Sequence, residues 1–357
     1  TKPRKLLQIV PRLPPYSDGV GDYSRLLAKQ LLTEHGIVTE FLSFRPGTET
    51  PDTIDGFYTH RLFEQSAEYF LSLLPEDLDG VILHYSNYPY LQGKLDTPSW
   101  LVDALGILMR DRNIPLVVMF HELPTLKWKQ LRILNPVQSR LSRQLARLAS
   151  SVVTDSHHFK EHLEYWTASS VTCIPDFSTI GEPQPEEIRP LALRQPRLVI
   201  FGGSDRIRAY RDIHQLRETC QALGIQEICD IGAKQAIDAE ALGAIKFTEM
   251  GFQPAETVRS LLLDSMAGLI DYSRFPGDLG KSSVFAAFCA HGVMPICTTY
   301  NPSEPDGIFV NQHYVLAGRH LSEWSTQRYQ AIATQARNWY CQHSLEINAR
   351  LFSSYFP

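Results

Sequence analysis

GLIDYSRFPGDLGKSSVFAAFCAHGVMPI, residues 268–296, decides the fold of this chain. Its apolar start predicts a strand, and the part rich in Gly and Pro predicts a loop. The run opened by Lys281-Ser282-Ser283 predicts a short helix that stops at Gly292, before a second strand. The first N–H groups of a helix lack intrahelical acceptors and lie at the positive end of its dipole, and Lys281 adds a full charge. We therefore expect a phosphate group to bind at this helix start.

The same alternation of short apolar runs and amphipathic stretches continues along the chain and is typical of βαβ units around parallel sheets. A proline-rich stretch with few hydrophobic residues, 183–196, indicates a linker. The predicted fold class is α/β, with one Rossmann-like domain at 1–182, completed by a C-terminal helix at 338–357, and a second at 190–337. The predicted strands are 5–10, 80–84, 115–120, 151–154, 197–201 and 228–231, and the predicted helices are 23–36, 98–112, 137–149, 212–223 and 255–264.

Length and composition favour a globular protein of two domains, with 357 residues, 43% hydrophobic and 20% charged. A formal net charge of -5 disfavours general nucleic-acid binding, which needs a cationic surface. The six cysteines form no CxxC pair, which favours reduced thiols. The sequence shows neither a signal-peptide pattern nor an apolar run long enough to span a membrane. We therefore expect a cytoplasmic location.

A loop that contains glycines, PPYSDGVGDY, follows the first predicted strand. Gly19 and Gly21 allow the backbone to approach a ligand closely, and the next helix offers its N-terminus. A tight strand-to-helix turn capped by Asp22 explains the same residues. Because Ser24 stands where a G-x-G-x-x-G pattern has its last glycine, a dinucleotide-dependent oxidoreductase is disfavoured.

Polar residues also follow two later strands of the first half. His84 precedes Tyr85 and Tyr88, and His121 precedes Glu122. The carboxyl ends of parallel strands meet at one edge of a sheet, so these side chains are expected near a ligand. A single histidine is more often structural, but two at equivalent strand ends favour a site, and His121 is the stronger candidate.

The first strand of the second half ends in FGGSDRIRAYR. Gly202 and Gly203 followed by Arg206 and Arg208 suit a diphosphate, because a guanidinium makes paired, charge-assisted hydrogen bonds to its oxygens. A solvated basic helix start explains any one of these arginines equally well. Together with Lys281, the arginines are predicted to surround one leaving group.

The dipeptide Lys281-Ser282 also ends the phosphate-binding pattern of NTPases, G-x-x-x-x-G-K-[ST]. The first glycine of that pattern falls on Phe275, so an NTPase is disfavoured.

Basic residues and a tryptophan occupy residues 123–154, which contain no acidic residue. A basic segment of helical spacing lies on anionic lipid headgroups or forms a solvated helix face, and both interpretations stay open. Lipid binding would place the protein peripherally at the inner face of the membrane. The residues are Lys127, Trp128, Lys129, Arg132, Arg140, Arg143 and Arg147.

In their order, these elements resemble a GT-B glycosyltransferase over nearly the whole chain, and are most similar to the large family-four group of nucleotide-sugar-dependent enzymes. The resemblance implies two Rossmann-like domains that face each other across a cleft. It implies transfer of a sugar from a nucleotide diphosphate sugar, such as UDP-glucose, to a glycan or lipid-linked acceptor with retention of configuration. The cations make a metal unnecessary for charge neutralisation, and we expect no cofactor.

The resemblance also assigns roles to residues. His121 would contact the donor sugar and Arg208 the donor diphosphate, while Arg206 would replace an arginine that the family has earlier. With Lys281, His121 and Arg206 are the predicted catalytic residues. The predicted donor-binding residues are Gly19, Val20, Gly21, Gly202, Gly203, Ser204, Arg208, Met250, Gly251, Phe252, Gly280, Ser282, Ser283 and Val284. The predicted acceptor-side residues are Tyr16, Asp18, Asp22, His84, Tyr85, Tyr88 and Glu122.

The chain departs from the family at its paired glutamates, whose positions fall on Leu279 and Ala287. In the family the second glutamate holds the ribose, so we expect binding to shift to the phosphates and the helix amides. The absence of both glutamates keeps two alternative functions open. A GT-B epimerase or hydrolase would act on the donor alone, and a catalytically weak partner protein would bind nucleotide without turnover.

Overall fold

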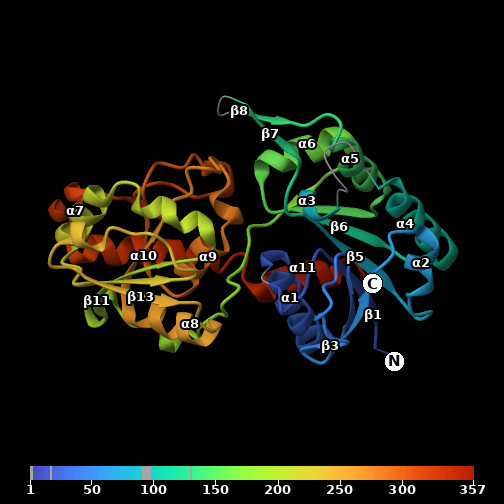
Figure 1. Ribbon diagram of the computed structural model, residues 1–357, viewed down its shortest axis with the longest axis horizontal. Helices are drawn as coiled ribbons and strands as arrows, with labels where there is room; N and C mark the ends of the chain where they lie inside the picture. The colour runs from blue at the N-terminus through green and yellow to red at the C-terminus, as the bar shows by residue number, and fades with distance from the viewer. Residues whose placement is uncertain (1–2, 17, 91–97, 129–130) are drawn as a thin grey trace. The chain divides into compact units, whose positions relative to one another are not determined.

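The computed structural model describes residues 3–16, 18–90, 98–128 and 131–357. Its contacts divide the chain into two compact units. Unit 1 consists of Thr1–Pro175 and Leu345–Pro357, and unit 2 of Asp176–Ser344. Each unit is a largely parallel sheet with helices on both faces, so the predicted α/β class is confirmed (Figure 1). The division lies before the proline-rich stretch 183–196, which belongs to unit 2.

The sheet of unit 1 has the strand order β10-β9-β6-β5-β1-β2-β4-β3, and only the pair β3 and β4 is antiparallel among its described strands. The order reverses between β1 and β5, where ligands bind in open parallel sheets. The strands are β1 (Lys5–Val10), β2 (Val38–Ser43), β3 (Thr53–Ile54), β4 (Phe57–Arg61), β5 (Gly80–Tyr85), β6 (Leu116–Phe120), β9 (Ser151–Thr154) and β10 (Thr172–Cys173).

Helices cover both faces of this sheet. On one face Leu83 and Phe120 form a core with Leu105 of α4 and Leu145 of α5. On the other face α1 and α11 lie side by side (Figure 1). The helices are α1 (Gly19–His35), α2 (Ala67–Ser72), α3 (Asn87–Tyr90), α4 (Ser99–Arg112), α5 (Ser139–Leu148), α6 (His157–Thr167) and α11 (Leu345–Ser354).

The basic stretch of unit 1 does not have the predicted helical form throughout. Its first part is an antiparallel hairpin of β7 (Thr125–Trp128) and β8 (Leu131–Leu134). Lys129 lies outside the described residues, as do the side chains of Lys127, Trp128 and Arg132. The remaining basic residues are exposed on α5, namely Arg140, Arg143 and Arg147.

The sheet of unit 2 is parallel and has the order β13-β12-β11-β14-β15-β16. One face forms a core in which α7 and α10 cover Leu198, Ile200 and Leu269. Helix α9 lies against Gly268 of β14, where the Phe288 ring fills the place of a side chain. The elements are β11 (Gln195–Phe201), α7 (Ile213–Leu223), β12 (Glu227–Ile231), β13 (Lys246–Gly251), α8 (Ala255–Asp264), β14 (Ser265–Ile270), α9 (Ser283–Ala290), β15 (Met294–Cys297), β16 (Val315–Leu316) and α10 (Thr326–Tyr340).

The C-terminal region contains two helices rather than one continuous helix. Helix α10 belongs to unit 2, and the chain returns to unit 1 as α11. There the Tyr23 hydroxyl donates to Asn348 Oδ1 at 3.1 Å, and Phe352 is fully buried. The C-terminal helix is therefore an integral part of unit 1.

The cysteines and the hydropathy of the helices bear on two further expectations. Each of the six cysteines is a free thiol, as predicted. In the described part of the chain, no helix combines the length and the apolar character that crossing a bilayer requires.

If α11 completes the core of unit 1, Phe352→Ala should lower the free energy of unfolding of that unit by about 3–5 kcal/mol, because it leaves a cavity. Arg350→Ala, at an exposed position of the same helix, is the matched control. Urea unfolding followed by tryptophan fluorescence measures the difference. Equal stability of the two variants would contradict the assignment of α11 to the core.

Candidate functional site

A cavity of about 220 Å³ lies in unit 2 at the carboxyl ends of β11 and β14. The strand order reverses between these two strands, so the cavity occupies the usual ligand position of a doubly wound sheet. Eight residues predicted from the sequence line it, namely Gly202, Gly203, Arg206, Arg208, Lys281, Ser282, Ser283 and Val284. The structure therefore brings the glycine pair, the arginines and the lysine to one place.

The helix start forms one wall of the cavity. Ser282 caps α9, and its hydroxyl accepts a hydrogen bond from the Phe285 amide at 3.1 Å. Ser283 and Val284 follow it at the positions whose amides have no acceptor within the helix. With Lys281 beside them, these amides and the helix dipole favour an anion in the cavity.

Arg206 lines the cavity, but its charge is already compensated. Its side chain is only 3% exposed and binds Asp230 through Nε at 3.0 Å and Nη2 at 2.7 Å. The Tyr210 hydroxyl donates to the same carboxylate at 2.5 Å, and burial together with Asp230 raises the pKa of Tyr210. Gly232, at φ 141°, leaves room for the guanidinium, which lies where a side chain would be. Arg206 is therefore placed to fix the cavity wall.

Arg208 is less constrained and shares a carboxylate with a residue that the sequence analysis overlooked. Asp205 lies 2.8 Å from Nη1 of Arg274 and 3.7 Å from Nε of Arg208. All three residues line the cavity, and Asp205 is half exposed. Two guanidiniums around one accessible carboxylate leave a net positive charge, so a phosphate can compete with Asp205 for both.

Asp271 is a second lining carboxylate that the sequence analysis did not assign. Its Oδ1 accepts from the Ser273 amide at 3.1 Å, and its Oδ2 accepts from the Thr298 hydroxyl at 2.8 Å. It directly follows β14, and an acidic residue at the end of an apolar strand was a signal that the sequence offered. Ala287, at the second family glutamate position, is buried at 1% exposure and offers no polar side-chain atom.

Five other predicted donor residues of unit 2 do not line this cavity. Gly251 ends β13, which is separated from β11 by β12, and the neighbouring Phe252 is 77% exposed. A side chain at Gly280 would lie 2.9 Å from Asp306. The assignment of these residues to the donor stays a prediction, as it does for Met250 and Ser204.

The first glycine loop of unit 1 is occupied by its own cap. Asp18, rather than Asp22, is the N-cap of α1, and its carboxylate accepts from the amides of Val20 and Gly21. Gly21 has no room for a side chain, because the carbonyl oxygen of residue 12 lies 2.5 Å from the Cβ position. Gly19 is open around its Cβ position. An incoming anion would meet the Asp18 charge here, so the loop is a weaker anion site than the start of α9.

The structure brings the two predicted histidines of unit 1 together. Nδ1 of His84 lies 3.1 Å from Nε2 of His121, and both residues are buried. Nε2 of His84 bonds Gln8 Oε1 at 2.9 Å, and Nδ1 of His121 lies 3.5 Å from Asp155 Oδ2. Burial, with a contribution from His121, holds the pKa of His84 well below its usual value. Both ring nitrogens of His121 thus have partners within unit 1.

The other predicted acceptor-side residues have varied surroundings. Glu122 accepts a hydrogen bond from the Ser86 hydroxyl at 3.0 Å. Tyr85 is fully buried in the core beneath α4 and α5, where its ring stacks on Tyr90. Asp22 forms an ion pair with Arg25, and Tyr16 lies against Gly47. The side chain of Tyr88 is outside the described part of the chain.

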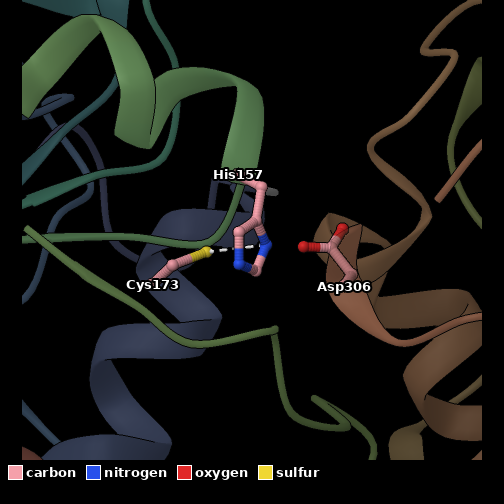
Figure 2. A group of neighbouring side chains, drawn as sticks. All are labelled: His157, Cys173 and Asp306. Carbon is pink, nitrogen blue, oxygen red and sulfur yellow. Dashed lines mark hydrogen bonds between the residues drawn. The ribbon is translucent and has the colours of Figure 1, made fainter. Parts of the chain in front are cut away.

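A thiol and an imidazole also meet in unit 1, although the sequence analysis assigned neither. Figure 2 shows Cys173, at the end of β10, with its Sγ directed at Nδ1 of His157, the first residue of α6. The two atoms are 3.5 Å apart. The pair forms a contact between the end of β10 and the start of α6.

Comparison of the fold with solved structures gives consistent likenesses over almost the entire chain. HepE of Anabaena, solved with UDP and glucose, is 12% identical at a TM-score of 0.62, over 98% of this chain and 99% of that one. An alpha-glucosyltransferase in complex with UDP-glucose and DNA containing an abasic site is 9% identical at a TM-score of 0.59, over 99% of both chains. The lipopolysaccharide outer core galactosyltransferase WaaB is 12% identical at a TM-score of 0.55, over 98% of both.

The sequence itself matches no family model, and it matches no curated protein. At such low identities the structural likeness establishes the fold. The chain therefore has the GT-B fold of these glycosyltransferases, as its order of elements predicted.

Proposed function

We propose that this protein is a glycosyltransferase that takes a sugar from a nucleotide diphosphate sugar. The observation that carries the proposal is the cavity of unit 2, where the start of α9, Lys281 and Arg208 surround one space. The solved structures of the same fold support it, because HepE binds UDP and glucose and the alpha-glucosyltransferase binds UDP-glucose. UDP-glucose or a similar UDP-sugar is the donor we propose.

The chemistry follows from where charge develops. Breaking the bond between the sugar and the diphosphate leaves negative charge on the departing phosphate oxygens. Donors and cations fixed around those oxygens stabilise the transition state more than the ground state. Lys281, Arg208 and the first amides of α9 supply that stabilisation in our proposal, and Arg274 adds a further positive charge. Arg206 acts as a wall of the cavity, because Asp230 already neutralises it.

For the acceptor we propose a glycan or a lipid-linked glycan. The similar structures include both a lipopolysaccharide outer core galactosyltransferase and an alpha-glucosyltransferase in complex with DNA. A formal net charge of -5 favours the glycan, because DNA binding depends on neutralising phosphates.

The exposed arginines of α5 are candidates for peripheral contact with anionic lipid. Co-flotation of the protein with anionic vesicles tests that contact. If the protein does not float with the vesicles, the proposed lipid contact is wrong.

Retention of configuration and independence of a metal complete the proposal. Retention rests on the family resemblance, and independence of a metal rests on the cations that line the cavity. The epimerase or hydrolase alternative differs in consuming donor without an acceptor. A nucleotide-binding protein without activity would bind the donor and convert none of it.

The donor class is tested by thermal shift with a panel of UDP-, GDP-, ADP- and TDP-sugars. A ligand that binds only the folded state raises Tm. We expect UDP-sugars to raise Tm, and sugars of the other nucleotides to have less effect. If no sugar nucleotide at millimolar concentration shifts Tm, the proposed function is wrong.

Lys281→Ala should lower kcat by about 10²–10³, which corresponds to about 2.7–4 kcal/mol, because it removes a donor to the leaving diphosphate. Lys234→Ala is a control in the same unit, since Lys234 is 86% exposed and does not line the cavity. Steady-state transfer assays measure both variants. Unchanged kcat in Lys281→Ala would remove this lysine from the reaction.

Chelation should leave the transfer rate unchanged, because fixed cations already neutralise the diphosphate. The measurement is the rate of transfer before and after treatment with EDTA and gel filtration. Loss of activity that Mg²⁺ or Mn²⁺ restores would show that the reaction needs a metal.

A further inference from the structure

A line of buried polar side chains crosses the sheet of unit 1. It runs from Thr39 of β2 through Gln8 of β1 and His84 of β5 to His121 after β6 and Asp155 after β9. The register explains the alignment. Gln8 pairs with residue 82, two before His84, and His84 pairs with residue 119, two before His121. Side chains two apart on a strand share a face, so all three lie on the face that α1 and α11 cover.

Asp155, at one end of this line, is a buried carboxylate that needs a positive charge near it. It is only 1% exposed, and its Oδ1 has no hydrogen-bond partner among the described residues. A buried carboxylate without a counter-charge is very unfavourable. The cation that faces it within unit 1 is His121, whose Nδ1 lies 3.5 Å from Oδ2. This pairing favours a proton on Nδ1 together with a positive charge on the ring.

The directions of the hydrogen bonds determine whether the other ring nitrogen of His121, Nε2, carries a proton. Gln8 donates from Nε2 to the Thr39 hydroxyl at 3.2 Å, which leaves its Oε1 to accept from Nε2 of His84. A neutral imidazole has one N–H group, so Nδ1 of His84 is an acceptor. Nε2 of His121 must then carry a proton and donate it along the 3.1 Å contact.

His84 is held neutral by its surroundings. It is fully buried, and the groups that face it are Gln8, His121, the Tyr23 ring from α1 and the Phe352 ring from α11. None of these side chains is a carboxylate. Tyr23 also contacts the ring of His121, and among the described residues of unit 1 the anion that faces this ring is Asp155.

We infer that Gln8 and His84 are positioning residues that keep His121 doubly protonated, as a cation paired with Asp155. They fix a positive charge at the carboxyl end of the unit 1 sheet, where ligands bind in this kind of fold. The proposed function enters this inference only in naming the reaction in which the positive charge would take part. The protonation of His121 is independent of that reaction.

The proton count is measured on the full chain with ring-¹⁵N histidine, by long-range ¹H–¹⁵N correlation at about pH 8. His121→Gln and His84→Gln identify the two signals by their loss. The inference predicts protons on both nitrogens of His121 and on Nε2 alone of His84. A His121 ring with only one proton would overturn the inference, whether or not sugar transfer is found. A Gln8 amide in the reversed orientation would produce that result.

Gln8→Leu tests the relay itself, because it removes the acceptor that fixes the proton of His84. The His84 proton then moves to Nδ1, and His121 keeps one proton. We expect the His121 signal to become that of a ring with one proton, and kcat/KM to fall on the order of tenfold. A Gln8→Leu protein that folds and shows the wild-type His121 signal would refute the relay.

Discussion

β11 and β14 are hydrogen-bonded neighbours, but the chain continues from them toward opposite edges of the sheet. This divergence leaves a space at their carboxyl ends that no strand connection covers. Gly202, at φ 130°, turns the chain at the end of β11, and Gly268 lets Phe288 seat α9 close to β14. The helix start is thereby directed at the space between the strands. The position of the proposed anion site follows from the topology of the sheet, and the lining cations add positive charge to it.

Two arginines of the same short segment differ in what they can do. Arg206 is buried against Asp230, so moving it toward a ligand would leave two uncompensated charges in the interior. Arg208 and Arg274 share the half-exposed Asp205, and water screens that arrangement. An incoming diphosphate can replace Asp205 at a small energetic cost. Burial, rather than residue type, therefore separates the structural arginine from the two that we propose to bind the ligand.

The sequence was sufficient for features that depend on local pattern. The strand Lys5–Val10 has its predicted bounds, and the start of α9 follows from its serine cap and lysine. Features that depend on distant partners were not predictable in this way. Gln8 lies within an apolar strand, and only the sheet register places it beside His84. Asp230 likewise looked like an ordinary residue of a strand, because its partner Arg206 comes from another element.

In our proposal the cavity of unit 2 binds a nucleotide chiefly through its diphosphate. Isothermal titration calorimetry with UDP and with uridine compares ligands that differ only in that group. Each charge-assisted hydrogen bond to the phosphates contributes about 1.5–3 kcal/mol, so UDP should bind at least about tenfold more tightly than uridine. Equal affinities for UDP and uridine, or no binding of UDP, would contradict the account.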